Sequence, residues 1–207
     1  MPIRALIADD HELFRSGLKQ LLLDALDAEE VREAETLDEA IEILTNDGAG
    51  DLVLVDLRMP GMSGAEALAA LRDGFPDAKI AVVSAVEDRS EIFAALSAGV
   101  HGYILKSLPA ADIAEAIRQI VAGRIYVPPA LGKREPGAPL ESPPPNSDKL
   151  TARQKEVLTE LLKGRSSKEI ARTLEIAEGT VKIHLAAIYR AIGVRTRAEA
   201  IAKLKSH

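Results

Sequence analysis

Cysteine is absent from this chain of 207 residues, and so is any long apolar run. Without cysteine there is no disulfide framework and no thiolate that could act as a nucleophile or a metal ligand. No apolar stretch approaches the length that a membrane-spanning helix needs. The first residues lead directly into a predicted strand that is followed by acidic residues, which is unlike a secretory signal peptide. These absences predict a soluble protein of the bacterial cytoplasm.

The chain also lacks the GxxxxGK[ST] phosphate loop and any internal repeat. Gly48 and Gly50 come before a predicted strand, whereas the glycines of a nucleotide-binding loop follow one. These glycines therefore indicate a turn, and the sequence shows no nucleotide cradle.

Positive charge is scarce in the first part of the chain and abundant in the last. Residues 1–130 contain 11 Lys and Arg against 23 Asp and Glu, a balance of −12. Residues 131–149 contain 3 against 3, and residues 150–207 contain 12 against 6, a balance of +6. An acidic domain joined to a basic one suggests nucleic acid as the partner of the basic domain, although a solvated basic surface would give the same counts.

Seven of the eleven prolines lie in residues 127–149, a segment with few apolar side chains. Such a composition predicts an extended, semi-rigid spacer on the surface. We therefore expect one domain at residues 1–126, a linker at 127–149 and a second domain at 150–207.

The first domain alternates short apolar runs with amphipathic segments. Strands are predicted near residues 3–8, 30–35, 51–56, 79–84 and 102–105, and helices near 12–26, 37–47, 64–73, 88–98 and 109–122. This alternation is typical of an α/β fold with a parallel sheet. Ligands bind at the carboxyl ends of such strands. Five side chains at four strand ends should converge there: Asp9, Asp10, Asp56, Ser84 and Lys106.

These five side chains suit phosphoryl chemistry. Three neighbouring carboxylates repel one another in a partly desolvated cleft, and a divalent cation that prefers oxygen ligands, such as Mg²⁺, relieves the repulsion. A carboxylate beside the cation can accept a phosphoryl group as an acyl phosphate. The Ser84 hydroxyl and the Lys106 ammonium would then align and neutralise the phosphoryl oxygens. Each residue alone could mark only a turn or a helix start, but their shared position at strand ends favours one site.

The motifs around these residues resemble the receiver domain of two-component response regulators. The likeness rests on residues 8–15, 55–64, 84–85 and 102–106 and covers roughly residues 1 to 125. It implies a flavodoxin-like fold with five parallel strands in the order 2-1-3-4-5. It also implies that Asp56 accepts phosphate from a sensor histidine kinase and that Ser84, Tyr103 and Lys106 form the switch and bind phosphate. In this family Mg²⁺ (or Mn²⁺) would be held by four groups: Asp9, Asp10, Asp56 and the backbone carbonyl of Arg58.

The second domain is predicted to contain four helices. Capping-box patterns at residues 151–154, 166–169 and 196–199 mark helix starts near 152, 167 and 197. The remaining helix runs from Glu178 to about Ile192. One apolar stripe of this helix should face the core: Val181, Leu185, Ile188 and Ile192. The opposite face carries basic and small apolar side chains, which suit the DNA major groove: Lys182, Ile183, Ala186, Ala187 and Arg190.

This domain resembles the LuxR-type helix-turn-helix over roughly residues 148–206, through segments 150–158, 168–171 and 179–184 and through Gly164. With the receiver, the arrangement resembles the NarL/FixJ branch of response regulators, which are transcription factors. The resemblance implies an all-α four-helix domain that reads an inverted repeat in double-stranded DNA as a homodimer formed on phosphorylation. The expected DNA-binding residues are Lys182, Ile183, Ala186, Arg190, Thr180 and His184. Packing or a phosphate contact is favoured for His184 over a metal role.

The sequence therefore predicts a DNA-binding transcriptional regulator that is switched by phosphorylation of Asp56 and is not an enzyme. The residues two beyond Asp56 and Ser84 are Arg58 and Val86, neither of which can orient water as a base, so self-dephosphorylation should be slow. Two alternatives remain: a phosphorylation-independent regulator whose receiver makes protein contacts, and a Mg²⁺-dependent phosphohydrolase, which usually needs a carboxylate where Arg58 stands. We also expect the acidic receiver to attract the basic domain and cover its DNA-reading surface before phosphorylation.

Overall fold

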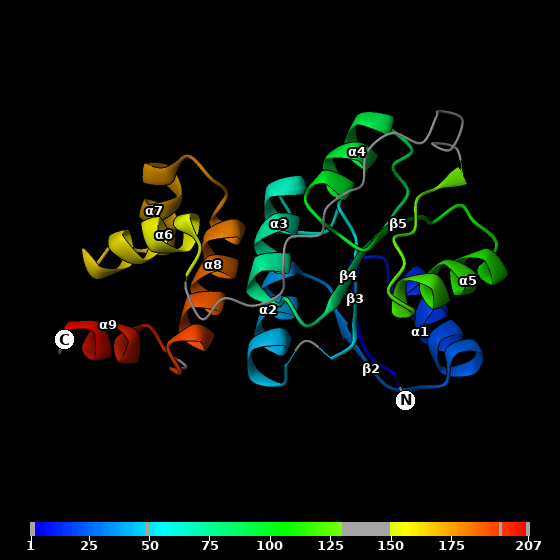
Figure 1. The fold of residues 1–207 in the computed structure, drawn as a ribbon, viewed down its shortest axis with the longest axis horizontal. Helices are drawn as coiled ribbons and strands as arrows, with labels where there is room; N and C mark the ends of the chain where they lie inside the picture. The colour runs from blue at the N-terminus through cyan, green and yellow to red at the C-terminus, as the bar shows by residue number, and fades with distance from the viewer. Residues whose placement is uncertain (1–2, 49, 130–149, 195, 206–207) are drawn as a thin grey trace.

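The computed structural model describes residues 3–48, 50–129, 150–194 and 196–205, which form two domains (Figure 1). The first domain is built on a parallel sheet with the strand order β2-β1-β3-β4-β5, so the predicted order is confirmed. Its strands are β1 (Ile3–Ala8), β2 (Ala28–Ala34), β3 (Leu52–Val55), β4 (Lys79–Ser84) and β5 (Gly102–Leu105).

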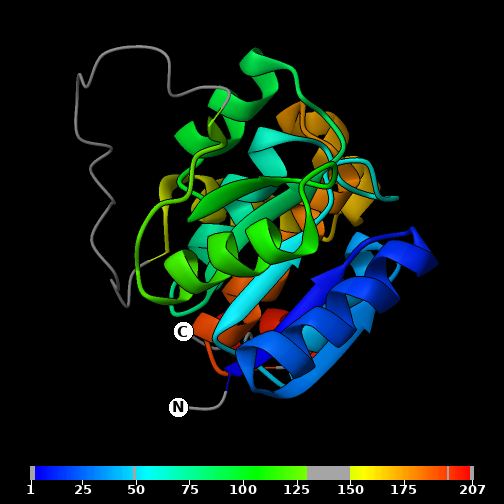
Figure 2. The same ribbon diagram turned by 90° about the vertical axis from the view of Figure 1, so that its right-hand side faces the viewer.

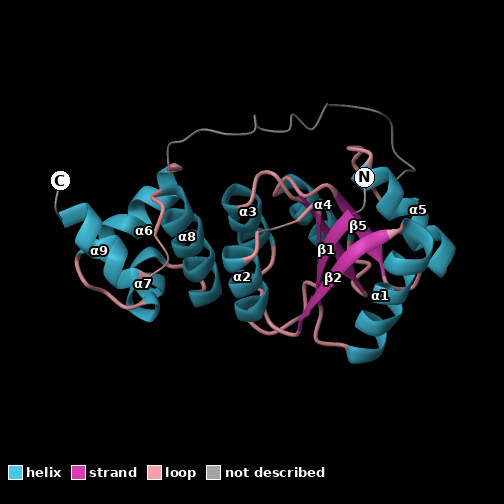
Figure 3. Cartoon of the chain, turned by 90° about the horizontal axis from the view of Figure 1, so that it is seen from below, coloured by secondary structure: helices cyan, strands magenta, loops and turns pink. Residues whose placement is uncertain are grey.

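The helices that follow these strands in the chain cover both faces of the sheet (Figures 2 and 3). They are α1 (Glu12–Leu26), α2 (Leu37–Asn46), α3 (Ala65–Gly74), α4 (Arg89–Ser97) and α5 (Ala110–Val121). Side chains of α2, α3 and α4 share one apolar core, and those of α1 and α5 share another. Strand β3 supplies both cores in alternation, Val53 and Val55 to the first and Leu52 and Leu54 to the second. A strand buried on both faces must be apolar throughout, which explains its unbroken run Leu-Val-Leu-Val.

Strand β2 departs most from its expected position, because it begins at Ala28 and ends at Ala34 instead of spanning 30–35. It lies at the edge of the sheet and pairs with β1, from Ile3 with Ala28 to Ala8 with Ala34. Most of its side chains are half-buried or exposed. An edge strand therefore lacks the continuous apolar run by which the central strands can be located in a sequence.

The second domain consists of α6 (Ala152–Leu162), α7 (Ser167–Leu174), α8 (Glu178–Ala191) and α9 (Arg197–Lys205). All four predicted helix starts are confirmed. The Thr151 and Ser166 hydroxyls accept hydrogen bonds from the backbone N–H three residues later, and the side chains of Gln154 and Glu169 accept the reciprocal bonds. These bonds satisfy N–H groups that would otherwise be unpaired at a helix start.

The apolar stripe of α8 forms the centre of the second domain's core, as its spacing predicts. Val181, Leu185 and Ile188 are buried against Val157 of α6 and Ile170 of α7. The predicted spacer lies almost entirely at residues 130–149, outside the described ranges. Within the described residues, no helix has both the length and the apolar character needed to cross a membrane.

Candidate functional site

The carboxyl edge of the receiver sheet gathers the predicted polar residues. Asp9 and Asp10 follow β1, Asp56 follows β3, Ser84 ends β4 and Lys106 follows β5. Asp9 and Asp56 are 1% and 2% exposed, and Ser84 is fully buried. The backbone N–H of Lys106 donates to the Ser84 carbonyl at 2.9 Å, which fixes these two strand ends side by side. Parallel strands therefore bring together residues that are far apart in the sequence.

Lys106 lies between the two buried carboxylates. Its Nζ is 2.6 Å from Asp9 Oδ2 and 2.9 Å from Asp56 Oδ2, and its side chain is 11% exposed. The ammonium also lies 4.7 Å from the ring centroid of Phe14, in a cation–π contact. Burial of charges is costly unless they are paired. The lysine compensates the two aspartates and is positioned to hold a third anionic group at Asp56.

The donor set at this edge fits a divalent cation. Ligand atoms of four residues lie within 4.8 Å of one another: Asp9, Asp10, His11 and Asp56. Asp56 Oδ1 is buried and has no hydrogen-bond partner among the described residues. A carboxylate oxygen that is shielded from water and left unpaired is costly, and clustered carboxylate oxygens are the ligands that Mg²⁺ prefers. Receiver domains typically bind Mg²⁺ at such an acidic site.

The predicted switch residues Ser84 and Tyr103 meet at the backbone of Val86. The Ser84 hydroxyl accepts a hydrogen bond from the Val86 N–H at 3.3 Å, and the Tyr103 hydroxyl donates to the Val86 carbonyl at 2.9 Å. Tyr103 is fully buried in the core, and burial raises the pKa of its hydroxyl. Its ring therefore points inward in this structure.

Arg15 supports the acidic site but was not singled out from the sequence. It is 6% exposed, and its guanidinium donates to the Asp9 carbonyl at 2.7 Å while pairing with Glu33 and Glu35. The available signal was its place on the buried stripe of α1, which continues with Leu18 and Leu22. A cation at a core position of an amphipathic helix indicates a buried ion pair.

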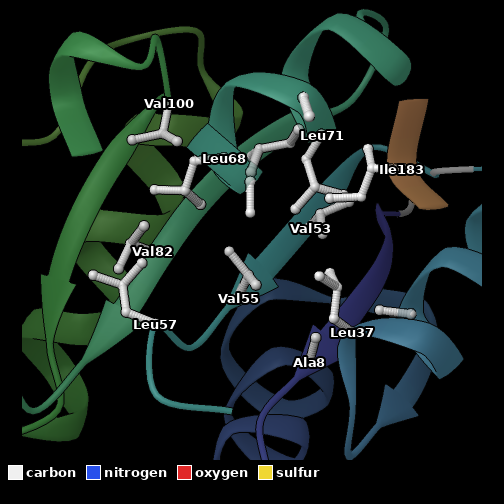
Figure 4. Close-up of a cluster of buried hydrophobic side chains, with 14 of the residues drawn as sticks. Ala8, Leu37, Val53, Val55, Leu57, Leu68, Leu71, Val82, Val100 and Ile183 are labelled. Atoms are coloured by element: carbon white, nitrogen blue, oxygen red, sulfur yellow. The ribbon is translucent and has the colours of Figure 1, made fainter. Parts of the chain in front are cut away.

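Helix α8 is not free, because the receiver covers one of its faces. Helices α2 and α3 lie between the sheet and α8 (Figure 1). Ile183 is fully buried and belongs to the receiver's own apolar core, beside Leu71 and Val53 (Figure 4). Ala186 belongs to the same core and is 8% exposed. The receiver therefore covers the face of α8 that the sequence predicts to read DNA, and apolar packing lies at the centre of this contact.

Polar contacts surround this apolar centre. Lys182 Nζ lies 2.5 Å from Asp38 Oδ2 on α2, and Arg153 pairs with Glu66 of α3 at 3.6 Å. The side chains of both partners in each pair are more than one-third exposed, so each pair contributes little free energy. The Ser63 and Thr180 hydroxyls share a hydrogen bond of 2.9 Å, and Thr180 is fully buried. The receiver thus pairs Lys182, an expected DNA-binding residue, with the carboxylate of Asp38.

Gly179 makes the close approach of α8 possible. A Cβ atom at this position would lie 2.4 Å from the Gly61 carbonyl oxygen and 3.1 Å from Leu37 Cδ2. Gly61 belongs to the loop between β3 and α3, which begins with Asp56. The start of α8 therefore rests on the backbone of the loop that carries the predicted phosphoacceptor.

The expected DNA-binding residues differ in their exposure and in their contacts with the receiver. Lys182 is partly exposed and paired with Asp38, whereas Thr180, Ile183 and Ala186 face the receiver. His184 is 4% exposed, its Nδ1 has no hydrogen-bond partner among the described residues, and burial lowers its pKa. The side chain of Arg190 lies outside the described part of the chain.

Comparison with known proteins identifies both domains. Residues 5–118 match the response regulator receiver domain family, and residues 148–204 match the luxR family of bacterial regulatory proteins. The glycerol metabolism activator of Pseudomonas putida is 38% identical over 205 residues, which cover 96% of this chain and 93% of that protein. The nitrate/nitrite response regulator NarP of Escherichia coli K12 is 38% identical over 203 residues, with 96% and 93% covered.

A solved structure supports the same assignment for the first domain. The receiver domain of the putative response regulator NarL from Mycobacterium tuberculosis superposes with a TM-score of 0.55 at 32% identity, covering 59% of this chain and 98% of that one. The match of both domains and the likeness to relatives over nearly the whole chain settle the family. The chain belongs to the response regulators of the NarL type, DNA-binding transcriptional regulators that join a receiver domain to a LuxR-type helix-turn-helix domain.

Proposed function

We propose that phosphorylation of Asp56 switches this regulator and that the change reaches α8 through the loop that follows Asp56. The observation that carries the proposal is the contact between this loop and α8. Ser63, near the end of the loop, shares a hydrogen bond with Thr180, and Gly61 packs against Gly179. A shift of the loop toward a phosphoryl group on Asp56 would act directly on the covered helix.

In the proposed transfer, a phosphoryl group passes from a histidine nitrogen of a sensor kinase to a carboxylate oxygen of Asp56. The N–P bond breaks and its electron pair stays on the nitrogen, while an O–P bond forms at Asp56. Lys106 and Ser84 hold the phosphoryl oxygens. Asp9, Asp10, Asp56 and the backbone carbonyl of Arg58 would hold Mg²⁺ or Mn²⁺, which neutralises charge on the transferred group when bound.

The covered face of α8 explains why phosphorylation would control DNA binding. Ile183 and Ala186 cannot pack against DNA while they lie in the receiver core, and Lys182 is held by Asp38. We propose that opening exposes this face and permits a homodimer that reads an inverted repeat in the bacterial cytoplasm. The half-sites would be about 10 base pairs apart, or a multiple of that, because each α8 must enter a major groove on the same side of the duplex.

In the open chain, Lys182 contacts a guanine edge or a phosphate and Ile183 contacts a thymine methyl or a sugar. Ala186 extends the same face and Arg190 is a further expected DNA contact, whereas the buried Thr180 and His184 contribute by packing. The alternative of a phosphorylation-independent regulator shares this DNA surface. A phosphohydrolase is disfavoured because the side chain of Arg58 is a cation paired with Glu91 at 2.6 Å.

Treatment of the full chain with acetyl phosphate and Mg²⁺ tests the proposal. We expect one phosphoryl group per chain in the parent and none in Asp56→Ala, followed by tighter binding of the parent to operator DNA obtained by selection. Asp77→Ala is the matched control because Asp77 is an exposed aspartate of the same domain, in the loop before β4. Persistent labelling of Asp56→Ala would refute the assignment. Labelling of the parent without any change in DNA affinity would favour the phosphorylation-independent regulator.

A further inference from the structure

His11 extends the acidic site beyond its carboxylates. Its Nδ1 lies 2.8 Å from Asp10 Oδ1, 3.1 Å from Asp9 Oδ1 and 3.8 Å from Asp56 Oδ2. The backbone N–H of His11 also donates to Asp9 Oδ1 at 2.9 Å, which holds the start of α1 against the site. The imidazole nitrogen therefore lies among the same oxygens that would surround a cation.

A second observation indicates that this cluster is a ligand site. Asp56 is 2% exposed, and its Oδ1 has no hydrogen-bond partner among the described residues. Lys106 forms its ion pairs with the Oδ2 atoms of Asp9 and Asp56, and not with Asp56 Oδ1. A buried carboxylate oxygen without a partner favours a further positive charge at this edge.

Imidazole changes the kind of cation that such a site prefers. Mg²⁺ selects carboxylate, carbonyl and water oxygens and accepts nitrogen ligands poorly. Divalent transition metals bind imidazole more readily, and Mn²⁺ also accepts the carboxylates that suit Mg²⁺. One nitrogen added to an oxygen site therefore shifts selectivity from Mg²⁺ toward Mn²⁺ and its heavier neighbours.

We propose that His11 is a direct ligand of the receiver cation through Nδ1 and makes the site selective for Mn²⁺ over Mg²⁺. The inference rests on the cation site of the proposed function and adds to that site a nitrogen ligand and a preference for Mn²⁺. The ring can turn into the site without displacing core side chains, because the His11 side chain is 63% exposed. Coordination by Nδ1 needs its lone pair, so in the metal-bound form the ring hydrogen would be on Nε2.

Electron paramagnetic resonance of the full chain with Mn²⁺ as the only added metal tests this inference. We expect the electron spin echo to show ¹⁴N modulation from a coordinated imidazole, and His11→Phe to abolish it while keeping a ring of similar size. His101→Gln is the matched control, because His101 precedes β5 and so lies at the opposite edge of the sheet from the acidic cluster. The control should keep the modulation.

Titrations with each metal give a second readout. His11→Phe should weaken Mn²⁺ binding by about tenfold or more, the size of effect that even residues supporting a metal ligand produce. Its affinity for Mg²⁺ should change much less. Mn²⁺ binding without nitrogen modulation, or an unchanged ratio of Mg²⁺ to Mn²⁺ dissociation constants in His11→Phe, would overturn the role of His11 alone. Failure of the parent to bind either ion would overturn the cation site itself.

Discussion

Gly179→Ala should separate α8 from the receiver. The added Cβ would lie 2.4 Å from the Gly61 carbonyl oxygen, whereas carbon and oxygen atoms in contact need more than 3 Å. The loop backbone cannot move aside as a flexible side chain would, so the start of α8 must withdraw by about 1 Å. A gap of that size removes roughly a quarter to a half of each dispersion contact across the interface.

The size of the effect follows from what the interface buries. Complete burial of a side chain such as Ile183 contributes about 1.5–3 kcal/mol, so partial loss there and at Ala186 should cost the closed arrangement about 1–2 kcal/mol. This corresponds to a roughly 5- to 30-fold increase in the open fraction. Alanine also favours the helix over glycine by about 0.5–1 kcal/mol, but equally in both arrangements, so that term does not oppose opening.

The absence of cysteine offers a direct assay. Ala186→Cys places a single thiol on the covered face of α8, and its rate of reaction with a thiol reagent reports the open fraction. We expect Gly179→Ala to raise that rate and to increase the radius of gyration in small-angle scattering. Gly17→Ala is the control, because a Cβ at this helical glycine would contact nothing within 4 Å. Equal thiol reactivity in the two variants would refute the reasoning.

Three further outcomes are expected. Lys182→Ala should weaken specific DNA binding by about 1–3 kcal/mol, measured by titration at several salt concentrations, whereas Asp38→Asn should remove the same ion pair and leave the affinity of the opened chain unchanged. Phosphorylated protein with Mg²⁺ should lose its label slowly, since Arg58 and Val86 cannot activate water; rapid loss measured by gel would contradict this. Burial lowers the pKa of His184 below its ordinary value of 6.5, so the unfolded chain binds more protons and the free energy of unfolding should fall as the pH drops below about 6.5. Denaturant titrations should show that fall reduced in His184→Gln, and an unchanged pH dependence would exclude His184 as its source.

Local patterns account for most of what the sequence predicted correctly. The capping boxes at Thr151 and Ser166 are formed within four residues, so the starts of α6 and α7 could be located without knowledge of the rest of the chain. The strand ends at Asp56 and Lys106 could be joined into one site because parallel topology has a fixed polarity. Strand β2 was placed less well because an edge strand has no apolar run to mark it.

Contacts between the domains could be predicted only in outline. The charge balances of −12 and +6 indicated attraction between the domains. The ion pairs Lys182–Asp38 and Arg153–Glu66 are partly exposed, however, and the centre of the contact is the buried Ile183. Amphipathic spacing shows that α8 has a second apolar face but does not reveal what covers it. Arg15 was missed as a site component because its partners Glu33 and Glu35 are distant from it in the sequence. The nitrogen of His11 was missed because its position depends on how the backbone folds at the end of β1.

The buried Tyr103 and the covered α8 occur in the same structure, so an inward tyrosine is compatible with the closed arrangement. The Tyr103 hydroxyl donates to the Val86 carbonyl, in the loop that follows β4. Helix α8 instead contacts α2, α3 and the loop after β3. Within that loop the Pro60 carbonyl accepts a hydrogen bond from the Leu37 N–H at 3.0 Å, which ties the loop to α2. A displacement of the loop at Asp56 would therefore act directly on α2 and α3, the helices that contact α8, without involving Tyr103. Because packed interfaces change between discrete arrangements instead of deforming gradually, we expect a small shift of this loop to release the helix.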